Sequence, residues 1–306
     1  MRHWGIRLKA VRGDIGLYGS PERSRFRTAV EDEAGRLFVL ERIHPAGYER
    51  RSLISRVLET LHADGLKQVN PYLATDDGEF LAFSGDAWWQ LSPFIQGSFL
   101  DRPAYIRDAE KGAALAGFLA GFYRLAGQCR EHRSLPFFSL KKYILKLEKE
   151  MMMYDPDVAG RLSSVLDYLH RSFLKIHDDL PVKFCHGDYH PLNIVWREDA
   201  VGAVIDWEFC GPKTEIYDIA NLVGCVGMEH PSGLAHNLVL TFLQGLRQAS
   251  VITEESWRYL PEAVVALRFA WMAEWLRKKD REMIDLETVY MNLLIDNRDK
   301  LKAAWG

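Results

Sequence analysis

The chain has 306 residues, of which 48% are hydrophobic and 26% charged, and its formal net charge at pH 7 is −3. This length is sufficient for one large or two small domains with proper hydrophobic cores. The near-neutral charge gives no electrostatic argument for a nucleic-acid or membrane partner. No apolar run is long enough for a signal peptide or a membrane span. Four cysteines without CxxC spacing indicate reduced thiols in a cytoplasmic protein.

Residues 1–91 are predicted to form a β-rich N-terminal lobe that binds nucleotide. Strands are predicted at residues 25–30 and 36–43, joined by an acidic turn. Apolar residues at helical spacing then predict a helix over residues 48–63. Two further strands, at residues 79–84 and 87–91, would be joined by a tight turn at Gly85 and Asp86. Because Pro93 has no amide proton, the chain should leave the sheet there, and we predict a hinge at residues 92–97.

Residues 98–306 are predicted to form a large, mainly helical lobe. Three apolar helices are marked by residues 115–125, 143–151 and 162–169, and later ones by about 216–227, 234–249, 255–278 and 284–303. The predicted fold class is therefore α+β, with a small antiparallel β-sheet lobe, one helix in that lobe, and a helical C-terminal lobe. Ligands are expected in the crevice between two such lobes.

The most informative segment is FCHGDYHPLNIVW at residues 184–196, followed by AVIDWE at residues 203–208. One apolar strand leads to Asp188, Asn193 follows five residues later, and a second apolar strand leads to Asp206. Kinase catalytic loops carry an aspartate and an asparagine at this spacing, and a later aspartate holds magnesium. The pattern predicts one carboxylate that orients the acceptor hydroxyl and takes its proton, and two oxygen ligands for Mg²⁺.

Two other interpretations of this segment remain open. The polar residues can simply be turn residues between two strands. Alternatively, His186, Asp188 and His190 alternate along the chain and would share one face of an extended strand, as in a metal-hydrolase site. Pro191 disfavours a strand that continues through this point. The metal-hydrolase interpretation also leaves Asn193 and Asp206 without a role.

Together with IYDIANLVG at residues 216–224, these segments resemble the aminoglycoside phosphotransferase and choline kinase superfamily, which has a protein-kinase-like fold. The resemblance extends over nearly the whole chain and is strongest at residues 180–225. It implies that Asp188 is the catalytic base and that Asn193 and Asp206 hold the magnesium. Asp218 and His186 would support the catalytic loop without contacting the substrate.

The resemblance also implies an activity, which is the transfer of a γ-phosphoryl group from ATP or GTP to a hydroxyl group, with Mg²⁺ as cofactor. The acceptor would be a small molecule of the amino alcohol, aminoglycoside, homoserine or sugar type, and the enzyme a monomer or homodimer. The alternative is a pseudokinase-like nucleotide-binding or scaffolding protein. It is suggested by an irregular glycine loop and by the absence of the usual kinase lysine.

The loop that binds the nucleotide phosphates should lie between the first two strands. Gly13, Gly16 and Gly19 are spaced by three residues there, and Ser20 follows. The spacing matches neither GxGxxG nor a Walker motif. We therefore predict Gly16, Gly19 and Ser20 as nucleotide contacts, with ordinary hairpin glycines as the alternative.

Kinases place a lysine on the third strand, where it pairs with nucleotide phosphates and with a glutamate of the next helix. Arg42 is the best substitute in this chain, with Glu49 as its predicted partner, and an exposed strand arginine is the alternative. The backbone at Ser92, Phe94 and Ile95 is predicted to contact the adenine edge. Phe94 would flank the ring or belong to the core.

An acceptor pocket is predicted on one late helix. Arg268, Trp271 and Trp275 share one face of it, and Glu274 adjoins Trp275. Stacked aromatic rings beside an acid suit a cationic amine. In the choline kinase branch, a late helix with closely spaced tryptophans binds a quaternary ammonium, although the spacing there is different. The alternative is that both tryptophans pack this helix against the lobe.

Overall fold

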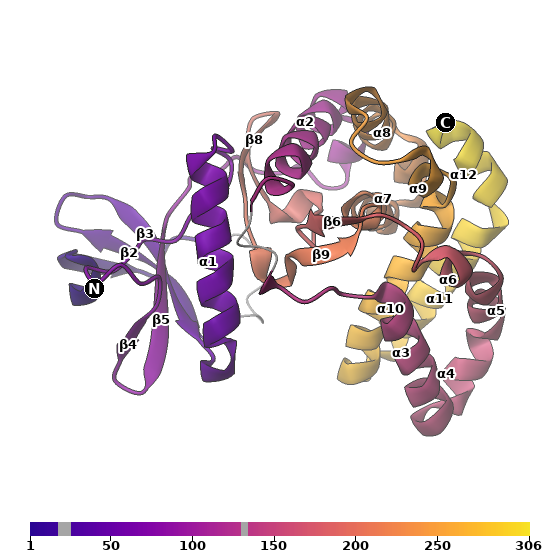
Figure 1. Cartoon of the computed structure of the whole chain (residues 1–306), viewed down its shortest axis with the longest axis horizontal. Helices are drawn as coiled ribbons and strands as arrows, with labels where there is room; N and C mark the ends of the chain where they lie inside the picture. Colours follow the sequence, from indigo (N-terminus) through magenta and orange to yellow (C-terminus); the bar gives the residue numbers. More distant parts are fainter. Residues whose placement is uncertain (18–25, 130–133) are drawn as a thin grey trace. The chain divides into compact units, whose positions relative to one another are not determined.

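The computed structural model describes residues 1–17, 26–129 and 134–306 (Figure 1). Contacts between residues divide the chain into two compact units. Unit 1 consists of Met1–Leu100, Gly121–Leu135 and Pro191–Cys210, and unit 2 consists of Asp101–Ala120, Pro136–His190 and Gly211–Gly306. Unit 1 thus joins the N-terminal hundred residues to two later segments.

Unit 1 contains an antiparallel five-stranded sheet in the order β1-β2-β3-β5-β4. The strands are β1 (Leu8–Arg12), β2 (Phe26–Asp32), β3 (Leu37–Ile43), β4 (Ala82–Ser84) and β5 (Ala87–Pro93). The single long helix beside the sheet is α1 (Tyr48–Ala63) (Figure 1). The observed bounds of α1 are those predicted from the apolar spacing.

Cross-strand pairing shows which face of the sheet α1 covers. Arg27, Glu41 and Gln90 are directly paired across β2, β3 and β5, so their side chains share one face. Gln90 is fully buried, and its amide donates a 2.7 Å hydrogen bond to the hydroxyl of Ser55 in α1. We call this side of the sheet the α1 face.

A short hairpin completes unit 1. It consists of β7 (Ile194–Arg197) and β8 (Ala200–Val204), which pair antiparallel with Ile194 opposite Val204. The 3₁₀ turns η6 (Pro191–Asn193) and η7 (Trp207–Phe209) flank it. Val204 donates its amide to the carbonyl of Gln68, which attaches the hairpin to the segment after α1.

Unit 2 is mostly helical. Its helices are α3 (Leu140–Tyr154), α4 (Pro156–Arg161), α5 (Ser163–Arg171), α6 (Phe173–Ile176), α7 (Tyr217–Glu229), α8 (Asn237–Ala249), α9 (Glu254–Arg258), α10 (Leu260–Lys278), α11 (Arg281–Asp296) and α12 (Arg298–Trp305). Helix α2 (Ala109–Ala126) begins in unit 2 and ends in unit 1. Strands β6 (Val182–Cys185) and β9 (Gly211–Thr214) pair antiparallel. Helix α7 is buried along most of its length and forms the centre of this unit.

The α+β fold class predicted from the sequence is confirmed, but two of the predicted helices are each divided into two. Helix 255–278 is interrupted at Tyr259, and Pro261 lies in the first turn of α10, where a missing amide proton costs little. Helix 284–303 is interrupted at Asn297, between α11 and α12. The strand predicted to end at residue 91 continues to Pro93.

Two further findings bear on the sequence-based expectations. In the part of the chain that the structure describes, no helix is long and apolar enough to cross a membrane. All four cysteines, Cys129, Cys185, Cys210 and Cys225, are free thiols.

Candidate functional site

One buried carboxylate accepts hydrogen bonds from the backbone of the loop after β6. Both oxygens of Asp218, a fully buried residue in the first turn of α7, accept backbone hydrogen bonds, from His186 at 2.7 Å and from Gly187 at 2.8 Å. Gly187 has φ 85°, a conformation that glycine adopts without strain. These charge-assisted contacts fix the loop backbone and support the bracing role predicted for Asp218.

Asp188, the predicted base, follows directly and is only 5% exposed. Its amide donates to Nδ1 of His186 at 3.2 Å, so the imidazole of His186 supports the loop. Nε2 of His190 lies 3.5 Å from a carboxylate oxygen of Asp188. Tyr189 is fully buried, and its carbonyl accepts a hydrogen bond from the Asn221 amide in α7. The carboxylate of Asp188 is therefore carried by a backbone with little freedom.

The two predicted magnesium ligands lie at the same end of one hairpin in unit 1. Asn193 immediately precedes β7, and Asp206 follows β8 after one intervening residue. The carbonyl of Asn193 accepts a 3.0 Å hydrogen bond from the amide of Ile205, which closes this end of the hairpin. Asp206 has φ 62°, a left-handed conformation that costs a non-glycine residue roughly 1–2 kcal/mol. Such strain is concentrated at functional sites, and amide and carboxylate oxygens are suitable ligands for Mg²⁺.

The alternative metal site would use His186, Asp188 and His190. Among the residues that the structure describes, no group of three or more His, Cys, Asp or Glu side chains is placed to hold a metal ion. Nδ1 of His186 accepts the amide proton of Asp188 and is thus used within the loop.

Arg42 lies on the side of the sheet opposite to the α1 face. It is paired across the strands with Phe26 and Trp89, whose ring centroids are 6.1 Å apart. Its guanidinium contacts the carboxylate of Asp86, in the β4–β5 turn, at 3.1 Å. Glu49 is exposed in the first turn of α1. The structure therefore pairs Arg42 with Asp86 instead of the predicted Glu49, and a nucleotide contact of Arg42 stays a prediction.

The α1 face carries charged residues that the sequence analysis did not assign. Glu41 is buried on β3, and its carboxylate lies 3.3 Å from Nε of Arg27 on β2. A sequence signal for this arrangement exists. Val39 and Ile43 flank Glu41 at two-residue spacing, so the branched apolar residues mark the covered face, and Glu41 rather than Arg42 belongs to it.

Two arginines of α1 contact the segment that follows Asp206. Arg50 donates hydrogen bonds of 2.8–3.0 Å to the carbonyls of Glu208 and Cys210. Arg51 donates to the Glu208 carboxylate at 3.2 Å and to the hydroxyl of Tyr72 at 3.3 Å. Helix α1 thus anchors the backbone just beyond the strained Asp206.

The predicted phosphate loop is described only in part. Gly19 and Ser20 lie outside the described residues. Gly16 is exposed, and a Cβ atom added to Gly16 or Gly13 would meet no described atom within 4 Å. The surroundings of Gly13 and Gly16 would therefore admit a side chain. The nucleotide contacts of Gly16, Gly19 and Ser20 stay predictions.

The predicted hinge begins inside the sheet. Ser92 is buried in β5 opposite Val39, and the amide of Phe94 donates to the carbonyl of Leu37 at 3.0 Å. Ile95 follows as a partly buried residue without assigned secondary structure. The adenine contacts predicted here stay untested.

The predicted acceptor residues of α10 form one aromatic and charged cluster in unit 2. The rings of Trp271 and Trp275 are stacked, with centroids 6.2 Å apart and an interplanar angle of 26°. The Arg268 guanidinium lies 5.7 Å from the Trp271 ring centroid, and the Lys278 ammonium lies 5.5 Å from that of Trp275. Glu274 pairs with Lys278, at 3.3 Å, and with Arg277. Protein cations thus already contact both rings.

This cluster includes a buried ion pair. Arg268 and Glu287 are both buried and form a two-pronged hydrogen-bonded pair. Indole Nε1 of Trp275 donates to the same carboxylate at 3.3 Å. Burial raises the pKa of the Cys225 thiol to about 12, and the charges of Asp188 and Glu287 act in the same direction, against Arg268. Asp188 and the ion pair therefore both lie within electrostatic reach of Cys225.

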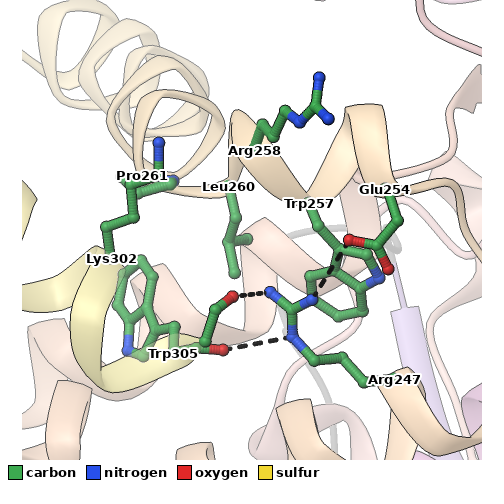
Figure 2. A pocket seen from close by; sticks show the side chains of 9 residues that line it. Arg247, Glu254, Trp257, Arg258, Leu260, Pro261, Lys302 and Trp305 are labelled. Carbon is green, nitrogen blue, oxygen red and sulfur yellow. Dashed lines mark hydrogen bonds and ion pairs between the residues drawn. The ribbon is translucent and has the colours of Figure 1, made fainter.

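A pocket elsewhere in unit 2 contains none of the predicted site residues (Figure 2). It lies among residues of α8, α9, α10 and α12. The guanidinium of Arg247 stacks 4.3 Å from the Trp257 ring centroid and donates to the carbonyls of Trp305 and Gly306. Figure 2 shows this arginine reaching toward the last residues of the chain. The contacts are those of a structural packing site.

The chain is similar in sequence to known proteins. A model of the phosphotransferase enzyme family matches residues 22–260. A homoserine kinase of Zymomonas mobilis is 23% identical over 169 residues, which cover 54% of this chain and 50% of that protein. The chain thus spans about half the length of this curated relative.

Solved structures are similar over nearly the whole chain. A microcompartment-associated aminopropanol kinase has a TM-score of 0.70 at 16% identity, covering 98% of this chain and 96% of that one. A spectinomycin phosphotransferase in complex with ADP and spectinomycin has a TM-score of 0.66 at 12% identity, with coverages of 96% and 94%. At these identities the similarity shows the fold, and it confirms the predicted bilobal kinase-like architecture.

Proposed function

Because the chain belongs to the phosphotransferase enzyme family, we propose that it transfers the γ-phosphoryl group of ATP or GTP to a hydroxyl group of a small molecule. The observation that carries the proposal is the arrangement of the catalytic-loop residues in this chain. Asp188 lies in a loop fixed by two hydrogen bonds to Asp218, and Asn193 and Asp206 lie together at one end of a hairpin.

The proposed role of Asp188 is to orient the acceptor hydroxyl and accept its proton as the phosphorus–oxygen bond forms. Phosphoryl transfer depends mainly on positioning and electrostatic stabilisation, because its transition state is loose and highly charged. A carboxylate on a fixed backbone suits this task, since it does not need to reorganise during the reaction.

Asn193 and Asp206 would hold the magnesium ion, which neutralises charge on the nucleotide phosphates when it is bound. Their side chains offer the oxygen donors that Mg²⁺ prefers. The hairpin hydrogen bond between Asn193 and Ile205 and the anchoring of the following backbone by Arg50 keep the two positions in place.

For the acceptor, we propose a hydroxyl compound that also carries an amine. Aminopropanol, homoserine and spectinomycin, the substrates in the names of the similar proteins, all combine these two groups. Trp271, Trp275 and Glu274 are the residues proposed to contact the amine, because they offer aromatic faces beside a carboxylate. The contacts of the Lys278 ammonium with the Trp275 ring and with Glu274 show the kind of cation that these groups favour. The Arg268–Glu287 pair fixes the ring of Trp275 through its indole N–H.

A phosphotransfer assay with Mg²⁺, ATP or GTP and a panel of amino alcohols, aminoglycosides and sugars tests the proposal. The native protein should phosphorylate at least one amine-bearing acceptor. Asp188→Asn should lower turnover by roughly 10²–10⁴-fold, the usual contribution of a positioned general base, while nucleotide binding stays near native. Near-native turnover in this variant would exclude Asp188 as the base.

The same assay separates the enzyme from the pseudokinase-like alternative. A scaffolding protein would bind nucleotide without transferring phosphate to any member of the panel, and Asp188→Asn would then leave its properties unchanged.

A further inference from the structure

A kinase needs fixed positive charge at the nucleotide phosphates, and protein kinases supply it with a lysine on β3 that pairs with a glutamate of the following helix. In this chain the charged residue of β3 that is buried on the α1 face is Glu41. The helix α1 presents Arg51 instead of an acid. The signs of the charges at these two places are thus the reverse of those in protein kinases.

Positive charge on the α1 face comes from two arginines on different elements. Arg27, on β2, is directly opposite Glu41, and Arg51, on α1, reaches Glu208 and the hydroxyl of Tyr72. The side chain of Arg27 is 16% exposed and that of Arg51 is 14% exposed. Both are therefore held in place by neighbouring acids and still accessible from solvent.

The charge of Asp206 acts on both Arg51 and Tyr72. Burial favours the neutral form of Arg51. Tyr72 and three carboxylates have the opposite and larger effect, so the pKa of Arg51 is raised; the carboxylates are Glu41, Glu208 and Asp206. Burial also raises the pKa of Tyr72, with Glu41 and Asp206 acting in the same direction, and Arg51 and Arg27 in the opposite one. Arg51 thus lies within electrostatic reach of Asp206 and also contacts Glu208, two residues further along the chain, while Arg27 and Asp206 both act on Tyr72. Phosphates bound to a magnesium ion at Asp206 would therefore lie near these arginines.

We propose that Arg27 and Arg51 together contact the nucleotide phosphates and replace the β3 lysine, while Glu41 and Glu208 position them. This inference rests on the proposed phosphotransferase function. Guanidinium groups suit the role, because each offers several donors in a planar fork that matches phosphate oxygens. In this proposal Arg42 has no role, because it lies on the opposite side of the sheet and pairs with Asp86.

The test compares the affinities for ATP and for adenosine, measured by titration calorimetry in the presence of Mg²⁺. Adenosine lacks phosphates, so a loss of phosphate contacts lowers only the affinity for ATP. Because a lone arginine substitution leaves a buried carboxylate unpaired, each arginine is replaced together with its partner, as Arg27→Gln with Glu41→Gln and as Arg51→Gln with Glu208→Gln. Arg56→Gln is the control, since Arg56 is an exposed residue of the same helix.

Each double variant should lower the preference for ATP over adenosine by about tenfold, the effect of losing one charge-assisted contact, and the control should keep the native preference. Glu41→Gln alone gives an independent measurement. Glutamine has the shape of glutamate and an amide oxygen that can still accept from Arg27, so Arg27 stays positioned while one negative charge near the phosphates is lost. ATP should therefore bind more tightly, and the affinity for adenosine should be unchanged. A native ATP preference in both double variants, or an unaltered ATP affinity in Glu41→Gln, would overturn the inference. Failure of the native protein to bind ATP at all would instead overturn the proposed function.

Discussion

At the residue scale, the identity of the partner decides what a charged side chain can do. Arg42 and Glu41 are neighbours in sequence, yet one contacts an exposed turn residue and the other lies buried beside Arg27. A one-residue shift along a strand changes the face of the sheet. For that reason the assignment of a phosphate contact on β3 depends on knowing which face α1 covers.

Trp271 is the residue at which the acceptor proposal is most directly tested. Trp271→Ala should raise the Michaelis constant for the acceptor by about two- to thirtyfold and leave the Michaelis constant for ATP almost unchanged. The expected rise corresponds to the loss of a cation–π contact of roughly 0.5–2 kcal/mol. Tyr290 keeps a second aromatic ring 5.5 Å from the Arg268 guanidinium, so the buried ion pair should survive. Steady-state kinetics and a thermal melt provide the measurements.

A comparable arginine–tryptophan contact provides the control for Trp271. Trp257 stacks on Arg247 at 4.3 Å in the structural pocket of Figure 2. Trp257→Ala should lower the melting temperature without a selective effect on the acceptor. If Trp271→Ala behaved in the same way, Trp271 would belong to the packing of α10 and not to the acceptor site.

At the scale of elements, the sequence predicts types and faces well where the apolar pattern is regular. The bounds of α1 follow directly from its apolar spacing, and the Gly85–Asp86 turn follows from turn chemistry, with Gly85 at φ 67°. Breaks inside long helices are predicted less well. The apolar pattern continues through Tyr259 and Asn297 because α9 and α10, and likewise α11 and α12, bury residues on either side of the break.

Close approach of two helices gives a prediction at this scale. Gly112 in α2 lies so near Leu238, in the first turn of α8, that an added Cβ would collide with its backbone carbonyl. Gly112→Ala should therefore destabilise the protein by roughly 1–3 kcal/mol, the usual cost of overpacking. Gly117, in the same helix, is exposed and has no described atom within 4 Å of a built Cβ.

Gly117→Ala is thus the matched control, and it should stabilise the protein by about 0.5–1 kcal/mol because alanine restricts the unfolded chain and favours helix. Denaturant titration of both variants measures the two effects. Equal stability of the two variants would show that α2 and α8 are not in the close contact described.

At the scale of the whole molecule, the sequence restricts the candidate catalytic residues more than it restricts the acceptor. Spacing and resemblance predict Asp188, Asn193, Asp206 and Asp218, and the structure gives each a defined backbone environment, while their catalytic and metal-binding roles stay predictions. The arrangement of Arg27 and Arg51 depends on strand register and helix placement, which a single sequence does not determine. The fold itself therefore follows from the sequence more readily than does the source of the phosphate-binding charge.

Stabilisation by ligand tests the metal site on the intact protein. A ligand present at 100 times its dissociation constant stabilises a folded protein by about 2.7 kcal/mol, so Mg²⁺ and ATP together should raise the melting temperature by several degrees. Asp206→Ala should abolish the part of this rise that depends on Mg²⁺, because it removes the carboxylate at the closed end of the β7–β8 hairpin. Asp199→Ala, at the turn of the same hairpin, should keep the Mg²⁺-dependent rise.

Chelating Mg²⁺ should reduce the rise in melting temperature of the native protein to the rise that Asp206→Ala shows with ATP. An undiminished Mg²⁺-dependent rise in Asp206→Ala would remove Asp206 from the metal site, since a rise of that size requires the ion to be bound.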